Sequence, residues 1–462
     1  MTEKRQISSR EAALQVLEDV LYHNAFSNDA LFSFFRLHPA LSDRDRRFAG
    51  YLLRSVLRNL LSLEAVIAHF SAVSIRKMKP RIRAILLLGS CELLKLSSPS
   101  YAVIHEYVQL AKRKGFAGLS GFVNAVLRKI SEGGAEVLLL QKGALHESLP
   151  EALYEDIISW YGEEAAGKIF AWFQKEEPDG LWIRRNRSRI SDALLREALL
   201  QEGMELLETP YGEDVYRLKH TGDLSASHAF RKGYFTVQDL SSALAGEIVK
   251  DLFVPERKRF SVLDACASPG GKTMHIADLI EAGMPDADIR FDSCDVSEEK
   301  VRRIRENLDR CGFSFVTPVV QDASMGKEAL SGCYDLVLLD VPCSGIGVIG
   351  KRPEIRFHAD ASERASLVSL QRQILEVNAG YVKPGGTLVY STCTISPEEN
   401  LLQVRAFLET HDDFRLQGFR DQLPGVLREA EDPASGYFQI LPGAYGSDGF
   451  FMARLCKQGS AV

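Results

Sequence analysis

The first part of the chain carries apolar residues at helical spacing. In residues 9–21, 42–70, 79–96 and 105–130 apolar positions recur every three or four residues, with arginines and lysines between them. No stretch here alternates as a half-buried strand would. The pattern predicts an all-helical bundle. It also predicts a linker at residues 131–136, "SEGGAE", where glycines interrupt the period.

The pattern changes twice after this linker. Residues 148–174 keep a helical period, and short strands are expected at 181–190 and 214–220 around a helix at 192–206. From residue 258 strands and helices alternate. The expected strands are 259–267, 288–296, 314–323, 334–342 and 385–393. The expected helices between them are 271–282, 297–312 and 362–382. A last strand pair is expected within 436–455.

These periods predict a multidomain fold. An all-α bundle is expected at residues 1–138, a small α+β module at 145–235, and an α/β domain at 236–458. Strands that alternate with helices form a doubly wound, largely parallel sheet of the Rossmann-like kind. We expect the last domain to be built in this way.

Composition excludes some classes of protein. The chain has 462 residues, 45% hydrophobic and 26% charged, as in ordinary globular proteins. No apolar run reaches the ~18 residues of a membrane helix, and residues 1–15 lack a signal-peptide core. We expect a cytoplasmic chain with no membrane partner.

The eight cysteines include no C-x-x-C pair and no His/Cys cluster at zinc spacing, so we expect no metal. Buried apolar roles are expected for Cys91, Cys294, Cys311, Cys333 and Cys456.

Charge is unevenly distributed along the chain. Residues 1–140 hold 20 Lys+Arg against 12 Asp+Glu, a net +8, whereas the rest hold 36 against 50, a net −14. A basic first domain suggests a polyanionic partner, although a merely solvated basic surface explains it equally well. Arginines also cluster in the middle module, at positions 184, 185, 187 and 189, where they could follow phosphates.

The first strand of the α/β domain ends in "DACASPGGKT". Gly270 and Gly271 permit close approach of the backbone to a ligand before a helix N-terminus. The stretch matches neither G-x-G-x-x-G nor the G-x-x-x-x-G-K-[ST] phosphate loop, which argues against a dinucleotide oxidoreductase and an NTPase.

Aspartates follow the next three strands. Asp295 lies 24 residues after Gly271, about where such folds hold ribose hydroxyls, and Asp322 and Asp340 end the third and fourth strands. Each alone is commonly a turn residue. Together they favour an adenosine compound bound without a phosphate loop, and S-adenosylmethionine fits.

Two cysteines lie at the ends of the predicted strands 334–342 and 385–393, Cys343 in "DVPCSG" and Cys393 in "YSTCTISPEEN". A thiol beside a methyl donor suggests a carbon acceptor that needs activation. C5 of cytosine is such a carbon, because it becomes nucleophilic only after a thiolate adds at C6. The base must leave its stack to reach the pocket.

"DACASPGGKT", "DVPCSG" and "YSTCTISPEEN" resemble three signature motifs of the RNA 5-methylcytosine methyltransferases, and "GYFTVQDLSSALA" and "DGFFMARL" resemble that family as well. "AVIHEYVQLAK" and "GFVNAVLRK" resemble the NusB-like helical RNA-binding domain. The combination is the layout of bacterial enzymes that modify small-subunit (16S) ribosomal RNA.

The resemblance assigns roles to the candidate residues. It implies Cys393 as the nucleophile, Cys343 as the thiol that helps release the product, and Asp340 as a contact to both the donor and the cytosine ring at N3. Spacing alone leaves the order of the two thiols open. The donor site implied comprises Cys266, Ala267, Ser268, Pro269, Gly270, Gly271, Lys272, Asp295, Asp322 and Asp340. Cys266 is expected to pack there without a catalytic role.

The expected substrate is 16S ribosomal RNA, either protein-free or early in assembly, acted on by a monomer. Two alternatives stay open. The enzyme could modify transfer RNA, or the chain could be a non-catalytic RNA-binding or antitermination factor. The intact glycine loop and both cysteines argue against the second alternative, because a binding factor needs none of them.

Overall fold

The computed structural model describes residues 7–96, 98–176, 180–211, 214–219, 224–430 and 432–459. The chain forms two compact units, one of residues 1–176 with 349–360 and one of 177–348 with 361–462. Residues 349–360 therefore group with the helical unit, although they lie within the sequence of the α/β domain. The three domain ranges expected from the sequence stay predictions.

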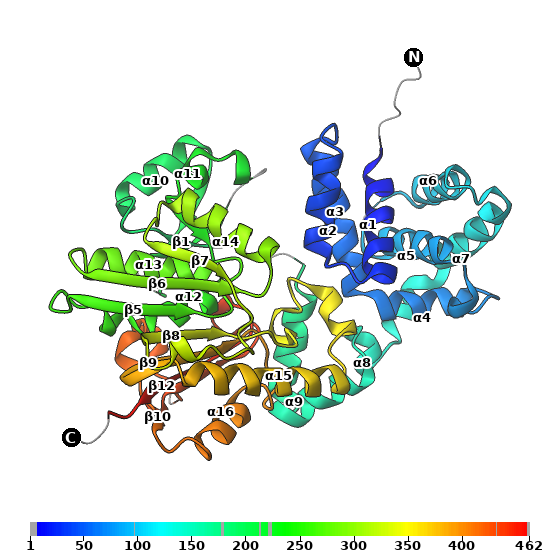
Figure 1. Cartoon of the computed structure of the whole chain (residues 1–462). Helices are drawn as coiled ribbons and strands as arrows, with labels where there is room; N and C mark the ends of the chain where they lie inside the picture. Colours follow the sequence, from blue (N-terminus) through cyan, green and yellow to red (C-terminus); the bar gives the residue numbers. More distant parts are fainter. Residues whose placement is uncertain are drawn as a thin grey trace. The chain divides into compact units, whose positions relative to one another are not determined.

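The first unit is all-helical, as its apolar spacing predicts (Figure 1). Ser8 and Ser42 cap the first turns of α1 and α3 through their side chains, and Pro80 begins α5, where its missing N–H costs nothing. The helices are α1 (Ser9–His23), α2 (Ser27–Leu37), α3 (Asp43–Arg58), α4 (Leu60–Phe70), α5 (Pro80–Lys95), α6 (Ser100–Arg113), α7 (Ser120–Leu139), α8 (Gly143–His146) and α9 (Glu151–Gln174).

The linker predicted at residues 131–136 is wrong, because this stretch lies inside α7. Gly134 is buried, and a Cβ at this position would lie 2.9 Å from the Ile130 side chain and 3.1 Å from that of Leu94. The glycine therefore serves close packing of α7 on its neighbours. This packing offsets the low intrinsic helix propensity of glycine.

Residues 349–360 are anchored in the helical unit by buried charges. The Glu354 carboxylate accepts hydrogen bonds from the Ser27 backbone N–H at 2.9 Å and from its hydroxyl at 3.0 Å. The Arg356 guanidinium donates to the backbone carbonyls of Arg58, Glu147 and Ser148 at 2.8–3.2 Å. Burial, with the nearby charge of Arg58, lowers the pKa of Arg356 to about 9. Arg356 is therefore still charged at neutral pH.

The second unit begins with a small α+β part, as the sequence predicts. Four antiparallel strands form a sheet in the order β2-β3-β1-β4. The elements are β1 (Leu181–Arg185), α10 (Asp192–Gln201), β2 (Glu205–Leu207), β3 (Val215–Lys219), α11 (His228–Arg231) and β4 (Phe235–Val237).

A larger sheet follows, in the order β10-β12-β9-β8-β5-β6-β7, with β11 paired to β12 (Figure 1). The five strands from β9 to β7 are parallel, and the last three strands of the chain pair antiparallel. This confirms the predicted doubly wound fold. The strands are β5 (Arg259–Asp264), β6 (Asp288–Asp295), β7 (Val316–Val320), β8 (Tyr334–Asp340), β9 (Val382–Thr392), β10 (Phe414–Leu416), β11 (Tyr437–Ile440) and β12 (Phe450–Lys457).

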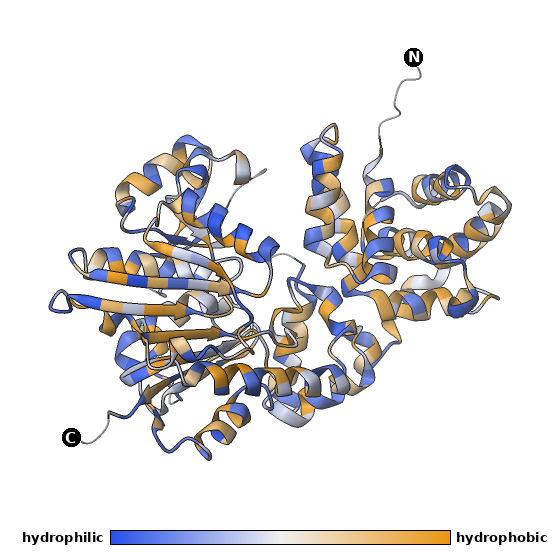
Figure 2. Ribbon diagram, viewed as in Figure 1, coloured by the Kyte–Doolittle hydropathy of each residue, from blue (hydrophilic) through white to orange (hydrophobic). Residues whose placement is uncertain are grey.

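Helices cover both faces of this sheet. Along β8, Leu336 and Leu338 join the core that holds α12, α13 and α14, whereas Val337 and Leu339 join the core that holds α15 and α16. A strand buried on both faces is apolar along its centre, and β8 is largely orange in Figure 2. The helices are α12 (Leu240–Glu247), α13 (Gly271–Gly283), α14 (Glu298–Cys311), α15 (Ala361–Ala379) and α16 (Leu401–Leu408).

Replacement of Glu354 by Ala should destabilise the helical unit. Two buried donors of Ser27 lose their acceptor and a cavity remains, at a cost of about 2–4 kcal/mol. A calorimetric scan of the full chain should show one transition lowered by about 5–10 °C. The control is Glu132→Ala at an exposed position of α7, which should shift the melt by less than about 2 °C. Equal melts for both variants would contradict the anchoring role.

Candidate active site

A cavity of about 330 Å³ lies at the carboxyl ends of the parallel strands. Asp295 ends β6, Asp322 follows β7 by two residues, and Asp340 ends β8. The lining residues are Ala265, Cys266, Ser268, Asp295, Val296, Lys300, Gln321, Asp322, Ala323, Ser324, Asp340, Pro342, Leu370 and Ile374. The three predicted aspartates thus meet at one cavity.

The glycine loop contributes to this cavity only in part. Cys266 and Ser268 line it, whereas Ala267 is buried, and neither Ala267 nor the stretch 269–272 is among the lining residues. Gly270 has φ +101°, a left-handed conformation that glycine adopts without strain, and it begins α13. The loop therefore shapes the entry to the helix, while its first residues face the cavity.

The carboxylates are held in different ways. Asp295 accepts from the backbone N–H groups of Ser268 and Val296 at 2.9 and 2.8 Å, and Lys300 lies 3.0 Å away. Asp322 is exposed and accepts from the N–H and hydroxyl of Ser324, which lowers its pKa. Asp322 is therefore both a turn residue and a cavity residue.

Lys272 is not among the lining residues but binds one of them. Its ammonium pairs with Asp340 Oδ2 at 2.6 Å and donates to the Ser242 hydroxyl at 3.2 Å. Ser391 donates to the other Asp340 oxygen at 2.9 Å. Asp340 is thereby fixed between β8, β9 and α13. Sequence reasoning missed Ser242 and Ser391, whose residue types carry no signal of this contact.

The two predicted thiols meet beside the cavity. β8 and β9 pair in parallel with Asp340 opposite Ser391, and Cys343 and Cys393 follow these strands. Their sulfur atoms lie 3.3 Å apart, with neither in a disulfide. Gly347 N–H donates to the Cys393 carbonyl at 3.1 Å, and a Cβ on Gly347 would lie 2.7 Å from that oxygen. Only glycine permits this close approach of the two loops.

The thiols differ electrostatically. The pKa of Cys343 is raised well above its ordinary value, first by its hydrogen bond to Cys393, then by burial and by the charges of Cys393 and Glu399. These influences favour the protonated form of the Cys343 thiol.

Two family models match the chain. Residues 252–456 match the model described as 16S rRNA methyltransferase RsmB/F, and residues 7–132 match the NusB family. A Bacillus subtilis (strain 168) protein named probable ribosomal RNA small subunit methyltransferase B is 33% identical over 463 residues, which cover 98% of this chain and 100% of that protein. A ribosomal RNA small subunit methyltransferase B of Klebsiella pneumoniae subsp. pneumoniae is 32% identical, covering 98% and 99%.

The chain belongs to the RsmB/F methyltransferase family. Membership confirms the S-adenosylmethionine-dependent methyltransferase and the NusB-like domain predicted from the sequence. Solved structures agree in fold. The crystal structure of PH0851 covers 97% of this chain and 98% of its own at TM-score 0.78 and 24% identity. NSun6 from Pyrococcus horikoshii, solved with SFG, covers 67% and 99% at TM-score 0.55 and 22% identity.

The cavity of this RsmB/F member fits the methyl donor chemically. Its carboxylates can accept from ribose hydroxyls and an exocyclic amine, and their charge favours a sulfonium cation. The side-chain amide nitrogen of Gln321, which lines the cavity, is buried without a hydrogen-bond partner. Such a donor is costly unless a ligand satisfies it, and adenine ring nitrogens are suitable acceptors.

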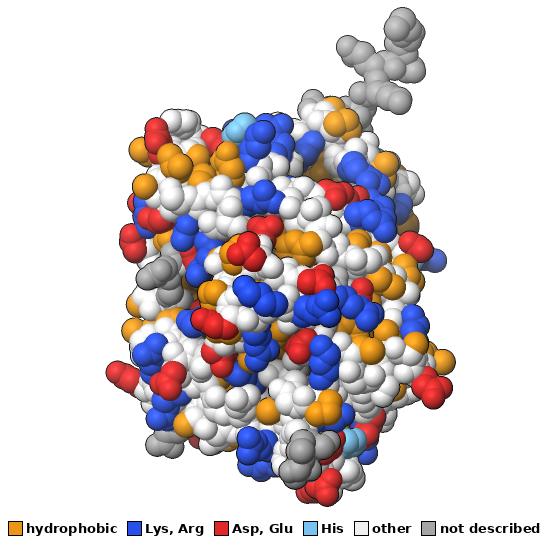
Figure 3. All heavy atoms as spheres, turned by 60° about the vertical axis from the view of Figure 1, so that its left-hand side comes forward, with side chains coloured by type: hydrophobic (Ala, Val, Ile, Leu, Met, Phe, Trp, Pro, Cys, Tyr) orange, Lys and Arg blue, Asp and Glu red, His pale blue; other side chains and the backbone are white. Residues whose placement is uncertain are grey.

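Most candidate RNA-binding arginines have structural roles. Arg184 is buried and pairs with Asp278 at 2.9 Å, while Arg185 and Arg187 both pair with Asp214. The interpretation of this cluster as a phosphate-following surface is therefore wrong for the buried Arg184 and stays a prediction for the others. Figure 3 shows a face on which basic and acidic side chains are interspersed.

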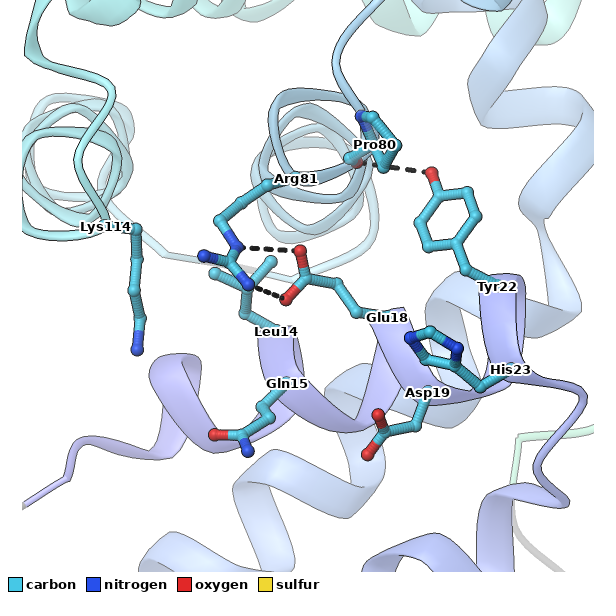
Figure 4. A pocket seen from close by; sticks show the side chains of 9 residues that line it. All are labelled: Leu14, Gln15, Glu18, Asp19, Tyr22, His23, Pro80, Arg81 and Lys114. Atoms are coloured by element: carbon cyan, nitrogen blue, oxygen red, sulfur yellow. Dashed lines mark hydrogen bonds and ion pairs between the residues drawn. The ribbon is translucent and has the colours of Figure 1, made fainter.

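The helical unit has its own hollow of about 480 Å³, lined in part by Glu18, Tyr22, Arg81 and Lys114 (Figure 4). Arg81 donates to both carboxylate oxygens of Glu18 at 2.8 and 3.0 Å, and Tyr22 donates to the Pro80 carbonyl. Lys114 pairs with Glu11 at 2.5 Å. These cations are neutralised within the unit.

Among the described residues, no group of three or more His, Cys, Asp or Glu side chains could hold a metal ion. No helix in that part of the chain is long and apolar enough to cross a membrane.

One buried carboxyl escaped the sequence reasoning. Asp264 ends β5 and is completely buried, with Thr273 donating to one oxygen at 2.6 Å and no partner on the other. Burial raises the pKa of Asp264 to about 7. A strand-end aspartate in the sequence gives no sign of such an environment.

Asp264 should give stability a pH dependence. The native state holds this proton up to about pH 7, whereas the unfolded chain releases it near 3.8, so stability falls as pH rises through that window. Relative to Asp264→Asn, the wild type should lose roughly 2–4 kcal/mol between pH 4 and 8. Calorimetric melts of both proteins across this range test the slope.

Asp286→Asn, at an exposed position, is the matched control and should keep the wild-type slope. If the stabilities of the wild type and Asp264→Asn changed with pH in parallel, Asp264 would be ionised in the native state throughout this range.

Proposed function

We propose that this chain transfers a methyl group from S-adenosylmethionine to C5 of a cytosine in 16S ribosomal RNA through a covalent cysteine adduct. The observation that carries the proposal is the pair of sulfur atoms, 3.3 Å apart, beside the acidic cavity. A methyltransferase acting on oxygen or an amine has no need of two adjacent thiols. A carbon acceptor needs one group to add and another to remove a proton.

Cys393 acts first. Its thiolate sulfur bonds to C6, and the electron pair displaced makes C5 nucleophilic. The donor supplies an electrophilic methyl group on a sulfonium sulfur. As Cys393 adds, negative charge builds on N3, which takes a proton from solvent. Asp340, held by Lys272 and Ser391, accepts a hydrogen bond from this N3–H, and the same proton returns to solvent when the methylated base is released. The C5 proton then leaves, the C6–sulfur bond breaks, and the pair returns to Cys393.

The coupling of the thiols explains how Cys343 becomes a base. While Cys393 is a thiolate, its hydrogen bond and charge keep the pKa of Cys343 high. Once Cys393 is bonded to C6, its sulfur is a neutral thioether and both influences disappear. Burial and Glu399 still raise the pKa of Cys343, but the loss of both influences of Cys393 lowers it. The Cys343 thiolate that forms when the proton is released to solvent can then take the proton from C5.

The two thiols should therefore fail differently when replaced. Cys393→Ala should lower methyl transfer at least about 1000-fold, because no adduct forms, with donor affinity unchanged within about twofold. Cys343→Ala should accumulate a protein–RNA adduct, since addition proceeds while release is slowed. Denaturing gels of labelled RNA detect the adduct. An adduct formed by Cys393→Ala would show that another residue is the nucleophile. The absence of an adduct in Cys343→Ala would contradict the role of Cys343 in product release.

Ribosomal RNA is favoured as the substrate by family and by relatives. Those relatives are named as small-subunit ribosomal RNA methyltransferases along nearly the whole chain, including the NusB-like part. Transfer RNA is the alternative substrate. A purely RNA-binding factor is not supported, because family membership already makes the chain a methyltransferase.

Transfer of labelled methyl groups to protein-free 16S ribosomal RNA tests the proposal. Label should appear in 5-methylcytidine at one site after digestion to nucleosides. Partly assembled subunits and a transfer-RNA pool are tested in parallel. Label only in transfer RNA would retain the chemistry and overturn the substrate. Label in another nucleoside would overturn the C5 chemistry.

A further inference from the structure

A buried carboxylate lies between the two cysteine-bearing loops. Glu399 is fully buried in the turn that precedes α16. Its neighbour Glu398 is exposed and accepts from the Ser396 hydroxyl at 2.7 Å, so the two adjacent glutamates differ sharply in environment.

The hydrogen bonds of Glu399 reach both loops. Its carboxylate accepts from the backbone N–H of Ser344 at 2.8 Å and from the Ser344 hydroxyl at 2.5 Å. It also accepts from the Thr394 hydroxyl at 3.4 Å, and the two hydroxyls lie 2.7 Å apart. Ser344 directly follows Cys343, and Thr394 directly follows Cys393. One carboxylate therefore binds the residue next to each sulfur.

Further bonds hold this carboxylate in place. Gln371 of α15 donates from one amide nitrogen to Glu399 at 2.9 Å and to the Pro342 carbonyl at 2.9 Å. Tyr390 donates its hydroxyl to the Glu399 carbonyl at 2.7 Å. Among the described residues no cation forms an ion pair with Glu399. A buried charge satisfied only by neutral donors is costly unless its hydrogen bonds are nearly complete, which demands a defined geometry.

We propose that Glu399 is a positioning residue that sets the separation and orientation of the Cys343 and Cys393 sulfurs by clamping the residue after each. The inference rests on the proposed two-thiol reaction. Glu399 touches neither substrate nor donor. It acts through Ser344 and Thr394, and its contribution belongs to the steps in which one sulfur bonds to C6 and the other receives the C5 proton.

The charge of Glu399 has a second effect. The groups facing Cys343 are Cys393, Glu399 and the Tyr390 hydroxyl, and the negative charges among them favour the protonated thiol. Glu399→Gln removes the negative charge and replaces one carboxylate oxygen, an acceptor, by an amide NH2 group, which donates. Glu399→Asp keeps the charge but is one methylene, about 1.5 Å, too short to reach both loops. The two variants separate charge from reach.

Kinetics of the full chain on its RNA substrate test both effects. Both variants should lower kcat at least tenfold, with KM for the donor unchanged within about twofold. Only Glu399→Gln should also move the pH–rate profile to lower pH, because Cys343 then loses its proton more readily. Glu398→Gln and Glu398→Asp are matched controls and should keep kcat within twofold. Wild-type kcat in Glu399→Asp would overturn the clamp.

A measurement without RNA separates this inference from the proposed function. Diamide takes two electrons and two protons from a neighbouring thiol pair and leaves a disulfide. Sulfur atoms 3.3 Å apart need little movement to bond. The Cys343–Cys393 disulfide, identified by peptide mapping, should form quickly in the wild type and in Glu398→Asp. In Glu399→Asp it should form at least five times more slowly.

Equal rates of disulfide formation would show that Glu399 does not hold the sulfurs and would overturn the inference, whatever the substrate proves to be. A slow rate in Glu399→Asp with no 5-methylcytidine from the wild type would retain the clamp and overturn the proposed function. If the Glu399 variants do not melt cooperatively, Ser344→Ala removes one arm of the clamp and should slow the same reaction at least twofold. An unchanged rate in this variant would also overturn the inference.

Discussion

The parallel pairing of β8 with β9 is the constraint on which the site depends. With Asp340 opposite Ser391, both strands end at the same edge, and the residues that follow them leave side by side. A shift of one residue would turn every side chain of a strand to the other face of the sheet. The 3.3 Å approach of Cys343 to Cys393 is therefore a consequence of this strand register.

The same edge collects negative charge, and the structure distributes it unequally. Asp295 and Asp340 each have a lysine and further donors, Asp322 is solvated and bound by Ser324, and Asp264 alone is buried without a cation. In the cavity expected to bind the methyl donor, the negative charge is thus only partly neutralised. The charge that remains suits a sulfonium cation. On the thiol side the described donors to Glu399 are neutral, and Glu399 contributes to raising the pKa of Cys343. The two halves of the site differ in how their carboxylates are satisfied.

Much of the fold and of the site could be predicted from the sequence, because the end of an apolar run marks the end of a strand. The carboxylates, both thiols and the alternating fold follow from that rule and from family resemblance. What the sequence could not give depends on tertiary contact. Gly134 continues a helix because it packs on Ile130 and Leu94, and Arg184 is buried because Asp278 lies opposite. Of the neighbours Glu398 and Glu399, only the fold decides which is buried.

The stretch after Cys343 links the chemistry to the helical unit through covalent connection. Six residues beyond Cys343 the chain enters the helical unit, and it leaves again at Asp360, immediately before α15. Inside, Glu354 bonds to Ser27, and Arg356 bonds to the carbonyls of three residues of that unit. The loop that carries one thiol is therefore continuous in sequence with a segment that the helical unit holds by buried hydrogen bonds.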